Sequence, residues 1–204
     1  MPVSAKIRIL NETDPASTVE IVKKLESAGA SAVTIHGRIK ESFYSGQVFH
    51  DVIAAARQAV KIQVIANGGI MDVSSYDTIR KATGCECVMV ARGAMGNPWI
   101  FEEIAMREQY QPPSIQELCA EIELHVLETI DYYGEELAMK VSRKLILDYM
   151  RGRGFPGGLK AEVSFLHKKE DFYSYLDKIR TEHTERYWHW LEKFPLAERR
   201  LRRA

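Results

Sequence analysis

The chain has 204 residues, and its 28 Lys and Arg residues are balanced by 28 Asp and Glu residues, which argues against a disordered or polyelectrolyte-like chain. The hydrophobic content of 46% suits a buried core, but the length falls short of the ~250 residues of a complete eight-stranded α/β barrel. Three cysteines without metal-ligand spacing argue against a disulfide framework or a metal site, and the lack of a signal peptide or a membrane-spanning apolar run predicts a cytoplasmic protein.

The first half of the sequence alternates predicted strands with predicted helices. Residues 3–10 (VSAKIRIL) form the first strand, and Asp14-Pro15 then supplies an N-cap and a proline at the first helical position. Three further units follow this pattern: SAVTIHG before a helix near 51–60, KIQVIANGG before a helix near 74–82, and CECVMVARG before a helix that opens at Pro98. Strands separated by helices imply parallel pairing, so the sequence predicts four βα units.

Only helices are predicted after the QPPS segment at 111–114. Ser114 and Glu117 form a capping box, and Gly134 can terminate the helix that follows. Further helices are predicted over 135–151 and 170–193. The predicted domains are a βα region at 1–110, a helical domain at 111–194 and a basic tail at 195–204.

Charge is unevenly distributed along the helical half. Residues 102–136 contain ten acidic residues and one basic residue, whereas residues 143–169 contain seven basic and two acidic residues. A basic surface on a neutral protein is typical of a nucleic-acid contact, because nearby charge sets the local field. The alternative is an ordinary solvated helix surface.

Polar residues and glycines gather at or just after the carboxyl ends of the predicted strands. These segments are His36-Gly37-Arg38, Asn67-Gly68-Gly69 and Arg92-Gly93. In an α/β barrel or open sheet, ligands bind at this edge, and glycine turns let backbone N–H groups approach an anion. Each segment alone is also compatible with an ordinary turn. Together they predict a ligand site, in units that correspond to strands five to eight of a barrel.

The first predicted strand adds two cations to this site. Lys6 and Arg8 are two residues apart and are predicted on one face, with Ile7 and Ile9 on the other. Cations directed inward require an anionic ligand or a carboxylate partner, although an exposed edge strand would also accommodate them. A bound cofactor is one source of the anion.

Several segments together resemble the tRNA-dihydrouridine synthase family, most closely its bacterial-type members. In order, these are KIRI at 6–9, IHGR at 35–38, YSG at 44–46, VIANGGI at 64–70, VMVARGAMGNPWIF at 88–101 and YYGEELA at 132–138, followed by Arg143-Lys144, Tyr149, Gly152 and Pro156-Gly157. The resemblance implies an α/β fold that forms the C-terminal half of a TIM-type barrel, followed by an all-α domain that binds tRNA.

The resemblance also implies an FMN-dependent enzyme that reduces the C5=C6 bond of uridine in tRNA with NADPH. Lys6 matches a lysine that stabilises the reduced flavin, and His36 matches a histidine in the flavin region. The residues that match phosphate-cradling turns are Asn67, Gly68, Gly69, Ala91 and Arg92. Arg8 and Arg38 are expected to orient the flavin or the uracil. The expected RNA contacts are Arg143, Lys144 and Arg153.

The sequence departs from the family at its general acid. That cysteine belongs to an Asn-x-Gly-Cys-Pro segment, which does not occur here, and Cys85 and Cys87 are predicted to be structural. The chain is therefore predicted to be an incomplete enzyme. It is a truncated reading frame, a portion of a longer protein, or a half that pairs with a separate N-terminal half-barrel chain or with itself. The alternatives are a tRNA-binding fragment without catalysis and another FMN- or phosphate-binding barrel.

Overall fold

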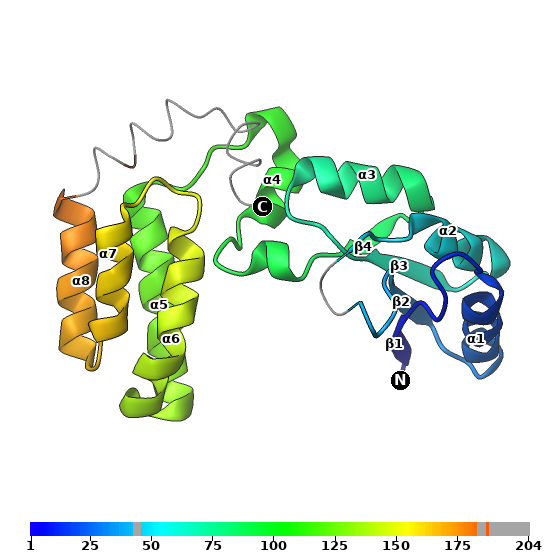
Figure 1. Cartoon of the computed structure of the whole chain (residues 1–204), viewed down its shortest axis with the longest axis horizontal. Helices are drawn as coiled ribbons and strands as arrows, with labels where there is room; N and C mark the ends of the chain where they lie inside the picture. Colours follow the sequence, from blue (N-terminus) through cyan, green and yellow to red (C-terminus); the bar gives the residue numbers. More distant parts are fainter. Residues whose placement is uncertain (43–45, 183–186, 188–204) are drawn as a thin grey trace. The chain divides into compact units, whose positions relative to one another are not determined.

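Figure 1 shows a computed structural model of the chain, which describes residues 1–42, 46–182 and 187. Contacts divide the chain into two compact units, Met1–Gly93 and Ala94–Ala204, and each unit has its own hydrophobic core. Among the described helices, none combines the length and apolar character needed to cross a membrane. The predicted tail at 195–204 and the first two residues of the YSG segment lie outside the described residues.

The first unit is a parallel four-stranded sheet with order β1-β2-β3-β4. Its elements, in chain order, are β1 (Ser4–Arg8), α1 (Ala16–Ser27), β2 (Ala32–His36), α2 (His50–Ala59), β3 (Gln63–Asn67), α3 (Val73–Thr83) and β4 (Cys87–Met89). The predicted alternation and parallel pairing are thus confirmed. This α/β arrangement is compatible with part of a TIM-type barrel.

The helices of the first unit cover one face of the sheet. Val33, Ile35, Val64 and Ala66 lie in a core that also contains residues from α1, α2 and α3. Because side chains alternate along a strand, the neighbouring residues face the opposite side. The core also contains Ile9 and takes in Ile7, so the predicted division of the first strand into two faces is confirmed.

Local signals fix several helix ends. The Ser114 side chain accepts a hydrogen bond from the Glu117 N–H, the Glu117 side chain accepts one from the Ser114 N–H, and Gly134 ends the helix, as predicted. The predicted N-cap at Asp14 is wrong by one residue, because the N-cap position of α1 is Pro15. The Asp14 carboxylate instead accepts the Ala16 N–H at 2.9 Å.

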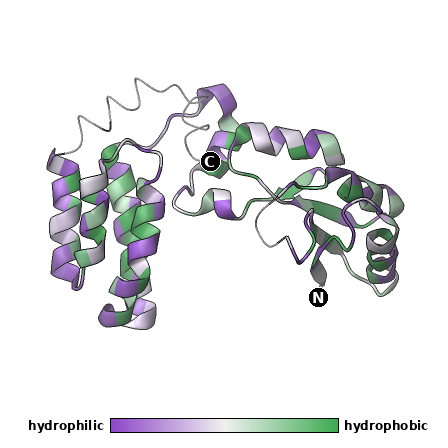
Figure 2. Cartoon of the chain, viewed as in Figure 1, coloured by the Kyte–Doolittle hydropathy of each residue, from purple (hydrophilic) through white to green (hydrophobic). Residues whose placement is uncertain are grey.

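The described elements of the second unit are helical. They are η1 (Arg92–Ala94), which spans the boundary, α4 (Ile100–Met106), η2 (Arg107–Gln109), α5 (Ile115–Tyr133), α6 (Glu135–Met150), α7 (Gly157–Glu162), η3 (Val163–Phe165) and α8 (Lys169–Glu182). Helix α5 packs against α6 and α8 around a core of aliphatic and aromatic side chains. Figure 2 shows hydrophobic and hydrophilic residues on the same helices, as expected of amphipathic helices.

The sequence-based predictions differ from this description at one helix boundary and one short helix. The helix predicted to open at Pro98 begins at Ile100, and the short helix α7 was not predicted. Helix α8 matches the start of the helix predicted over 170–193, while most of the chain beyond residue 182 is outside the described ranges. The division into functional domains at 110/111 stays a prediction.

Candidate functional site

Three residues singled out in the sequence meet at the carboxyl edge of the sheet. In the strand register, Arg8 lies beside His36, and His36 lies beside Asn67. Neighbouring strands are ~4.8 Å apart, so these side chains, which lie on the face opposite the core of the first unit, are close neighbours. Lys6 lies on the same face beside Thr34, one pleat farther from the edge, and is exposed. The register therefore assembles residues that are far apart in the chain.

Arg38 is held beside His36 by the segment that follows β2. Its Nε and Nη2 atoms donate to the Gly46 carbonyl oxygen at 3.1 and 3.0 Å, and its Nη1 atom lies 3.4 Å from His36 Nε2. Arg8 donates from Nη1 to the Ile39 carbonyl oxygen at 2.9 Å. Carbonyl oxygens orient these guanidinium groups but carry no net charge, so the bonds leave their positive charge in place.

His36 is surrounded by positive charge. Burial has the largest effect on the pKa of His36, and together with Arg8, Lys6, Arg38 and Arg92, in decreasing order of effect, it lowers this pKa to about 4. Burial, Arg92 and Arg8 also lower the pKa of Arg38. The imidazole is therefore neutral near pH 7, and the four cations around it favour an anion at this edge.

A glycine turn completes the edge. Asn67 Nδ2 donates to the Met89 carbonyl oxygen at 2.8 Å, and Gly68 and Gly69 follow with φ values of 133° and 68°. A Cβ on Gly68 would lie 3.1 Å from His36 Cδ2. Neither glycine N–H donates to another described residue. Backbone N–H groups in such a turn, next to cations, are a donor set that fits phosphate. Ala91 and Arg92 follow β4 and are exposed.

This electrostatic setting predicts a pH-dependent stability. The pKa of His36 is about 4 in the folded chain and about 6.5 in an unfolded one. Between these values the unfolded chain binds more protons, so this contribution is fully present above pH ~6.5 and is lost as the pH falls to ~4. The free energy of unfolding, measured with urea, should fall between pH 7 and pH 4.5. We expect this fall to be smaller in His36→Gln than in the wild type by on the order of 2 kcal/mol. Equal losses in both proteins would contradict the assignment.

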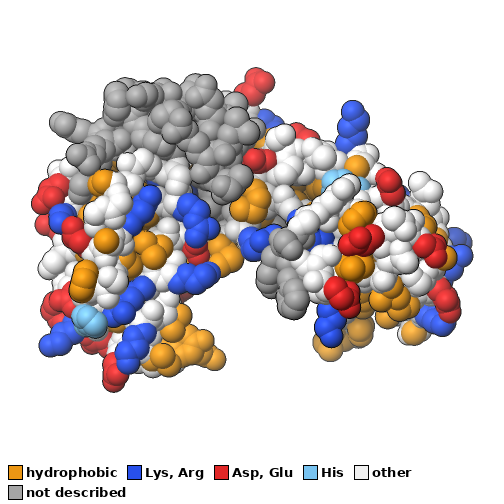
Figure 3. Space-filling model, in the orientation of Figure 1, with side chains coloured by type: hydrophobic (Ala, Val, Ile, Leu, Met, Phe, Trp, Pro, Cys, Tyr) orange, Lys and Arg blue, Asp and Glu red, His pale blue; other side chains and the backbone are white. Residues whose placement is uncertain are grey.

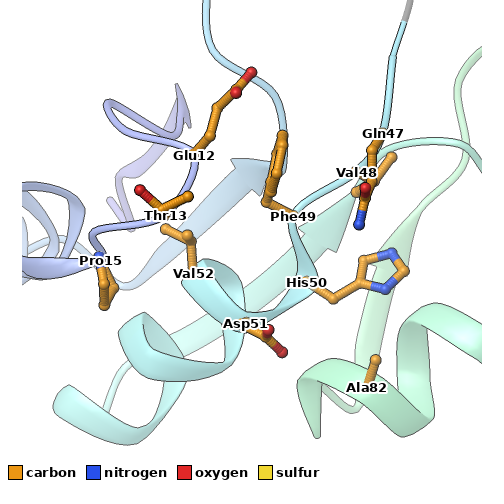
Figure 4. A pocket seen from close by; sticks show the side chains of 10 residues that line it. All are labelled: Glu12, Thr13, Pro15, Gln47, Val48, Phe49, His50, Asp51, Val52 and Ala82. Carbon is orange, nitrogen blue, oxygen red and sulfur yellow. The ribbon is translucent and has the colours of Figure 1, made fainter.

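A separate pocket of about 410 Å³ lies in the first unit, beside residues 47–52 at the start of α2 (Figure 4). Its lining includes Glu12, Gln47, Val48, His50 and Asp51. Figure 4 shows the two carboxylates pointing in opposite directions, and burial lowers the pKa of His50. The acidic lining distinguishes this pocket from the cationic sheet edge and does not suit an anionic ligand.

Cys85 and Cys87 lie before and at the start of β4, away from the carboxyl edge of the sheet. Cys85 is buried in the core of the first unit, where burial raises the pKa of its thiol. Cys87, which is half-buried, opens β4 and accepts a hydrogen bond from Gln63 Nε2 at 3.0 Å. Cys119 is buried among the helices of the second unit, and burial raises its pKa to about 11. Raised pKa values make Cys85 and Cys119 poorly reactive.

The second unit carries the residues predicted to bind RNA, and Figure 3 shows several Lys and Arg side chains on one face of its helices. Arg143 donates to the Leu166 carbonyl oxygen at 3.1 Å and lies 3.1 Å from His167 Nδ1. Lys144 pairs with Asp148 at 3.4 Å and keeps 72% of its side chain exposed. Both cations belong to α6.

Arg153 is placed differently, because it is only 3% exposed. Its guanidinium donates to the carbonyl oxygens of Gly96 and Tyr149 and to Asn97 Oδ1, and it lies 5.5 Å from the centre of the Trp99 ring. These contacts tie the 96–99 segment to the end of α6 and leave almost no surface for a phosphate.

Arg151 was not singled out in the sequence, yet it is exposed. Its Nη2 atom lies 2.6 Å from Asp148 Oδ1, and 64% of its side chain is accessible. The Asp148 side chain is only 4% exposed, and it pairs with two exposed cations, Lys144 and Arg151. The charge count at 143–169 was the available signal, but it does not show which arginine faces outward.

Comparison with protein families gives a match of residues 1–184 to the family described as dihydrouridine synthase. The chain belongs to this family. The family resemblance predicted from the sequence motifs is thereby confirmed.

Individual family members show similar coverage. The tRNA-dihydrouridine synthase B of Proteus vulgaris is 36% identical over 155 residues, which cover 74% of this chain and 48% of that protein. The enzyme of the same name from Pseudomonas aeruginosa is 33% identical over 172 residues, with 81% and 50% covered. A probable tRNA-dihydrouridine synthase of Rickettsia conorii is 34% identical over 156 residues, with 74% and 47% covered. The chain thus spans about half the length of these curated relatives.

Proposed function

We propose that this chain supplies the cofactor-phosphate and tRNA-binding half of a tRNA-dihydrouridine synthase, an FMN- and NADPH-dependent cytoplasmic oxidoreductase that saturates the C5=C6 bond of uridine. The observation that carries the proposal is the meeting of Arg8, Arg38, neutral His36 and the Gly68-Gly69 turn at one sheet edge of a family member. Parallel α/β sheets bind ligands at this edge.

The residues at the edge fit FMN in two ways. The N–H groups of Gly68 and Gly69, with Ala91 and Arg92 after β4, would hold its phosphate. Lys6 and Arg8 would place positive charge on the inner face, where charge stabilises a reduced flavin. When bound, FMN supplies the hydride for uracil C6. The residues of this chain would bind and orient the cofactor, and their positive charge would stabilise its reduced form.

The uridine must leave the RNA stack before it reaches this edge, so the enzyme must grip the surrounding backbone. We propose that the helical region 111–194 does this through exposed cations that meet phosphates. The exposed Lys144 and Arg151 and the half-buried Arg143 support this proposal, because they lie on or directly after α6. Arg153 is left out because of its burial.

The sheet itself supports a second half-barrel as partner. Among the described strands, β1 and β4 each pair on one side only, and Lys6 and Arg8 lie on the face opposite the helices that form the core of the first unit. Open strand edges favour association with further strands. We propose that four strands from a longer protein, a separate chain or a second copy complete the barrel. Only the first two sources would also bring the general-acid cysteine, because its motif is not in this sequence.

The proposal is tested with the full chain and a supplied N-terminal half from the Proteus vulgaris relative. We expect FMN binding, seen as quenching of flavin fluorescence, and NADPH-dependent formation of dihydrouridine, seen by mass spectrometry of tRNA nucleosides. FMN binding without dihydrouridine would favour another flavin barrel. tRNA binding without FMN binding would favour the non-catalytic alternative.

The proposed RNA surface predicts a defined salt dependence. We expect Lys144→Gln and Arg151→Gln each to weaken tRNA binding and to lower the slope of log K against log salt by about 0.7–0.9, because each removes one phosphate contact. The matched control is Lys24→Gln on α1, which removes an exposed cation paired with Glu20 and should leave the slope unchanged. If the wild type and the three variants all gave a similar slope, this surface would be excluded as the tRNA contact.

A further inference from the structure

Arg38 and His36 form a buried pair with a fixed orientation. Their exposed fractions are 6% and 7%. Two atoms of the guanidinium, Nε and Nη2, share the Gly46 carbonyl oxygen at 3.1 and 3.0 Å, which leaves Nη1 directed at His36 Nε2, 3.4 Å away. The arginine is therefore anchored on one side and meets the imidazole on the other.

The chemistry of the pair determines the protonation of the ring. A guanidinium has only donors, so its partner atom must present a lone pair. His36 Nε2 is therefore unprotonated, and a neutral imidazole with an unprotonated Nε2 carries its proton on Nδ1. The charged groups that act on the ring are Lys6 and Arg8 from β1, Arg38, and Arg92 after β4. All are cations, and nearby positive charge disfavours the protonated ring.

The other ring nitrogen is available to a ligand. The Gly68 turn lies against Cδ2, the carbon next to Nε2, so the Nε2–Cδ2 edge is enclosed by Arg38 and the turn. Nδ1 has no hydrogen bond to any residue that the structure describes, and it is absent from the buried polar atoms that lack a partner. The Nδ1–H group is therefore not engaged by the described residues.

We propose that Arg38 is a positioning residue that holds His36 as the neutral Nδ1–H tautomer, so that the ring donates a hydrogen bond to an acceptor oxygen of the bound ligand. The acceptor is a carbonyl or phosphate oxygen. Its assignment to FMN rests on the proposed function, whereas the tautomer follows from the arginine contact alone. In this role Arg38 acts through His36, which distinguishes it from an arginine that only supplies charge.

The test is an NMR measurement on the full chain with ¹⁵N-labelled histidine, with His36 assigned by loss of its signals in His36→Gln. Long-range proton–nitrogen spectra distinguish protonated from unprotonated ring nitrogens. We expect protonated Nδ1 and unprotonated Nε2 near pH 7. In Arg38→Met we expect the Nε2–H form to appear, whereas Arg38→Lys, which keeps a cationic donor, should retain the Nδ1–H form. Arg57→Met removes an exposed arginine of α2 and should change nothing at His36.

Three results would overturn the proposal: a wild-type ring protonated on Nε2, a wild-type ring that is cationic at pH 7, or an unchanged tautomer in Arg38→Met. The wild-type spectrum decides without any variant, and the other five histidines report whether Arg38→Met is folded.

Addition of FMN separates this inference from the proposed function. We expect FMN to shift the Nδ1–H resonance while the tautomer is kept. Failure of FMN to bind would contradict the proposed cofactor and leave the tautomer to be judged on the free chain. FMN binding that moves the proton to Nε2 would overturn the donor role.

Discussion

Replacing Gly96 with alanine is expected to unfold the second unit or to destabilise it by more than about 3 kcal/mol. Gly96 has a φ of 64°, and a Cβ there would overlap the backbone atoms of Asp148 and Tyr149. Backbone at the end of α6 cannot move aside as a flexible side chain can. Displacement of this segment would also remove the Gly96 carbonyl oxygen from Arg153, so that this buried cation would lose one of its acceptors.

The matched control is Gly158→Ala in α7. No atom lies within 4 Å of the added Cβ, and the backbone at Gly158 does not have a positive φ. We expect this change to be neutral or to stabilise the unit by about 0.5 kcal/mol, because alanine restricts the unfolded chain. Urea unfolding followed by circular dichroism measures both variants. A Gly96→Ala protein with the wild-type midpoint would show that the 96–99 segment does not pack on α6 as described.

The architecture of the first unit follows from local sequence patterns. Short β-branched runs such as AVTIH alternate with amphipathic segments, and the connections contain glycine, proline and aspartate, so strand and helix are distinguished by periodicity and by their boundaries. Parallel pairing then requires that the carboxyl ends of the strands share one edge. This geometric rule is why His36 and Asn67, 31 positions apart in the sequence, were expected together.

Side-chain direction outside regular elements does not follow from such patterns. Arg151 and Arg153 both come after α6 ends at Met150, in a segment where Gly152 and Gly154 have φ values of 65° and 80°. No helical or strand period applies there, so the sequence could not show that Arg151 faces solvent while Arg153 is buried. Which arginine is free to bind RNA depends on tertiary contacts.

The same reason explains what the sequence missed around Arg38. Its position after β2 placed it at the ligand edge, but its anchor is the Gly46 carbonyl oxygen, eight residues away in the sequence. Motif matching identifies such an arginine as a ligand residue without showing which side chain it orients. The contact with His36 is visible only once the chain is folded.

The second large effect is expected at Gly68, where we predict that alanine weakens FMN binding by roughly 10–100-fold, about 1.4–2.8 kcal/mol. Its φ of 133° is a conformation that L-residues rarely adopt, at a cost of about 1–3 kcal/mol. The added methyl would also lie 3.1 Å from both His36 Cδ2 and Val48 Cγ1. Relief of both strains requires the turn to move, and this withdraws the N–H groups of Gly68 and Gly69 from a phosphate.

Gly84→Ala provides the control that separates this local effect from general strain. Gly84 caps α3 with a φ of 67° and has no atom within 4 Å of an added Cβ, so alanine there should cost about 1 kcal/mol of stability and leave FMN affinity unchanged. Flavin fluorescence titration measures the affinity, and urea unfolding measures the stability. If Gly68→Ala binds FMN as tightly as the wild type does, the phosphate does not lie at this turn. Of the two glycines, only Gly68 adjoins the cationic edge. If both variants lose affinity equally, general strain in the unit is therefore responsible.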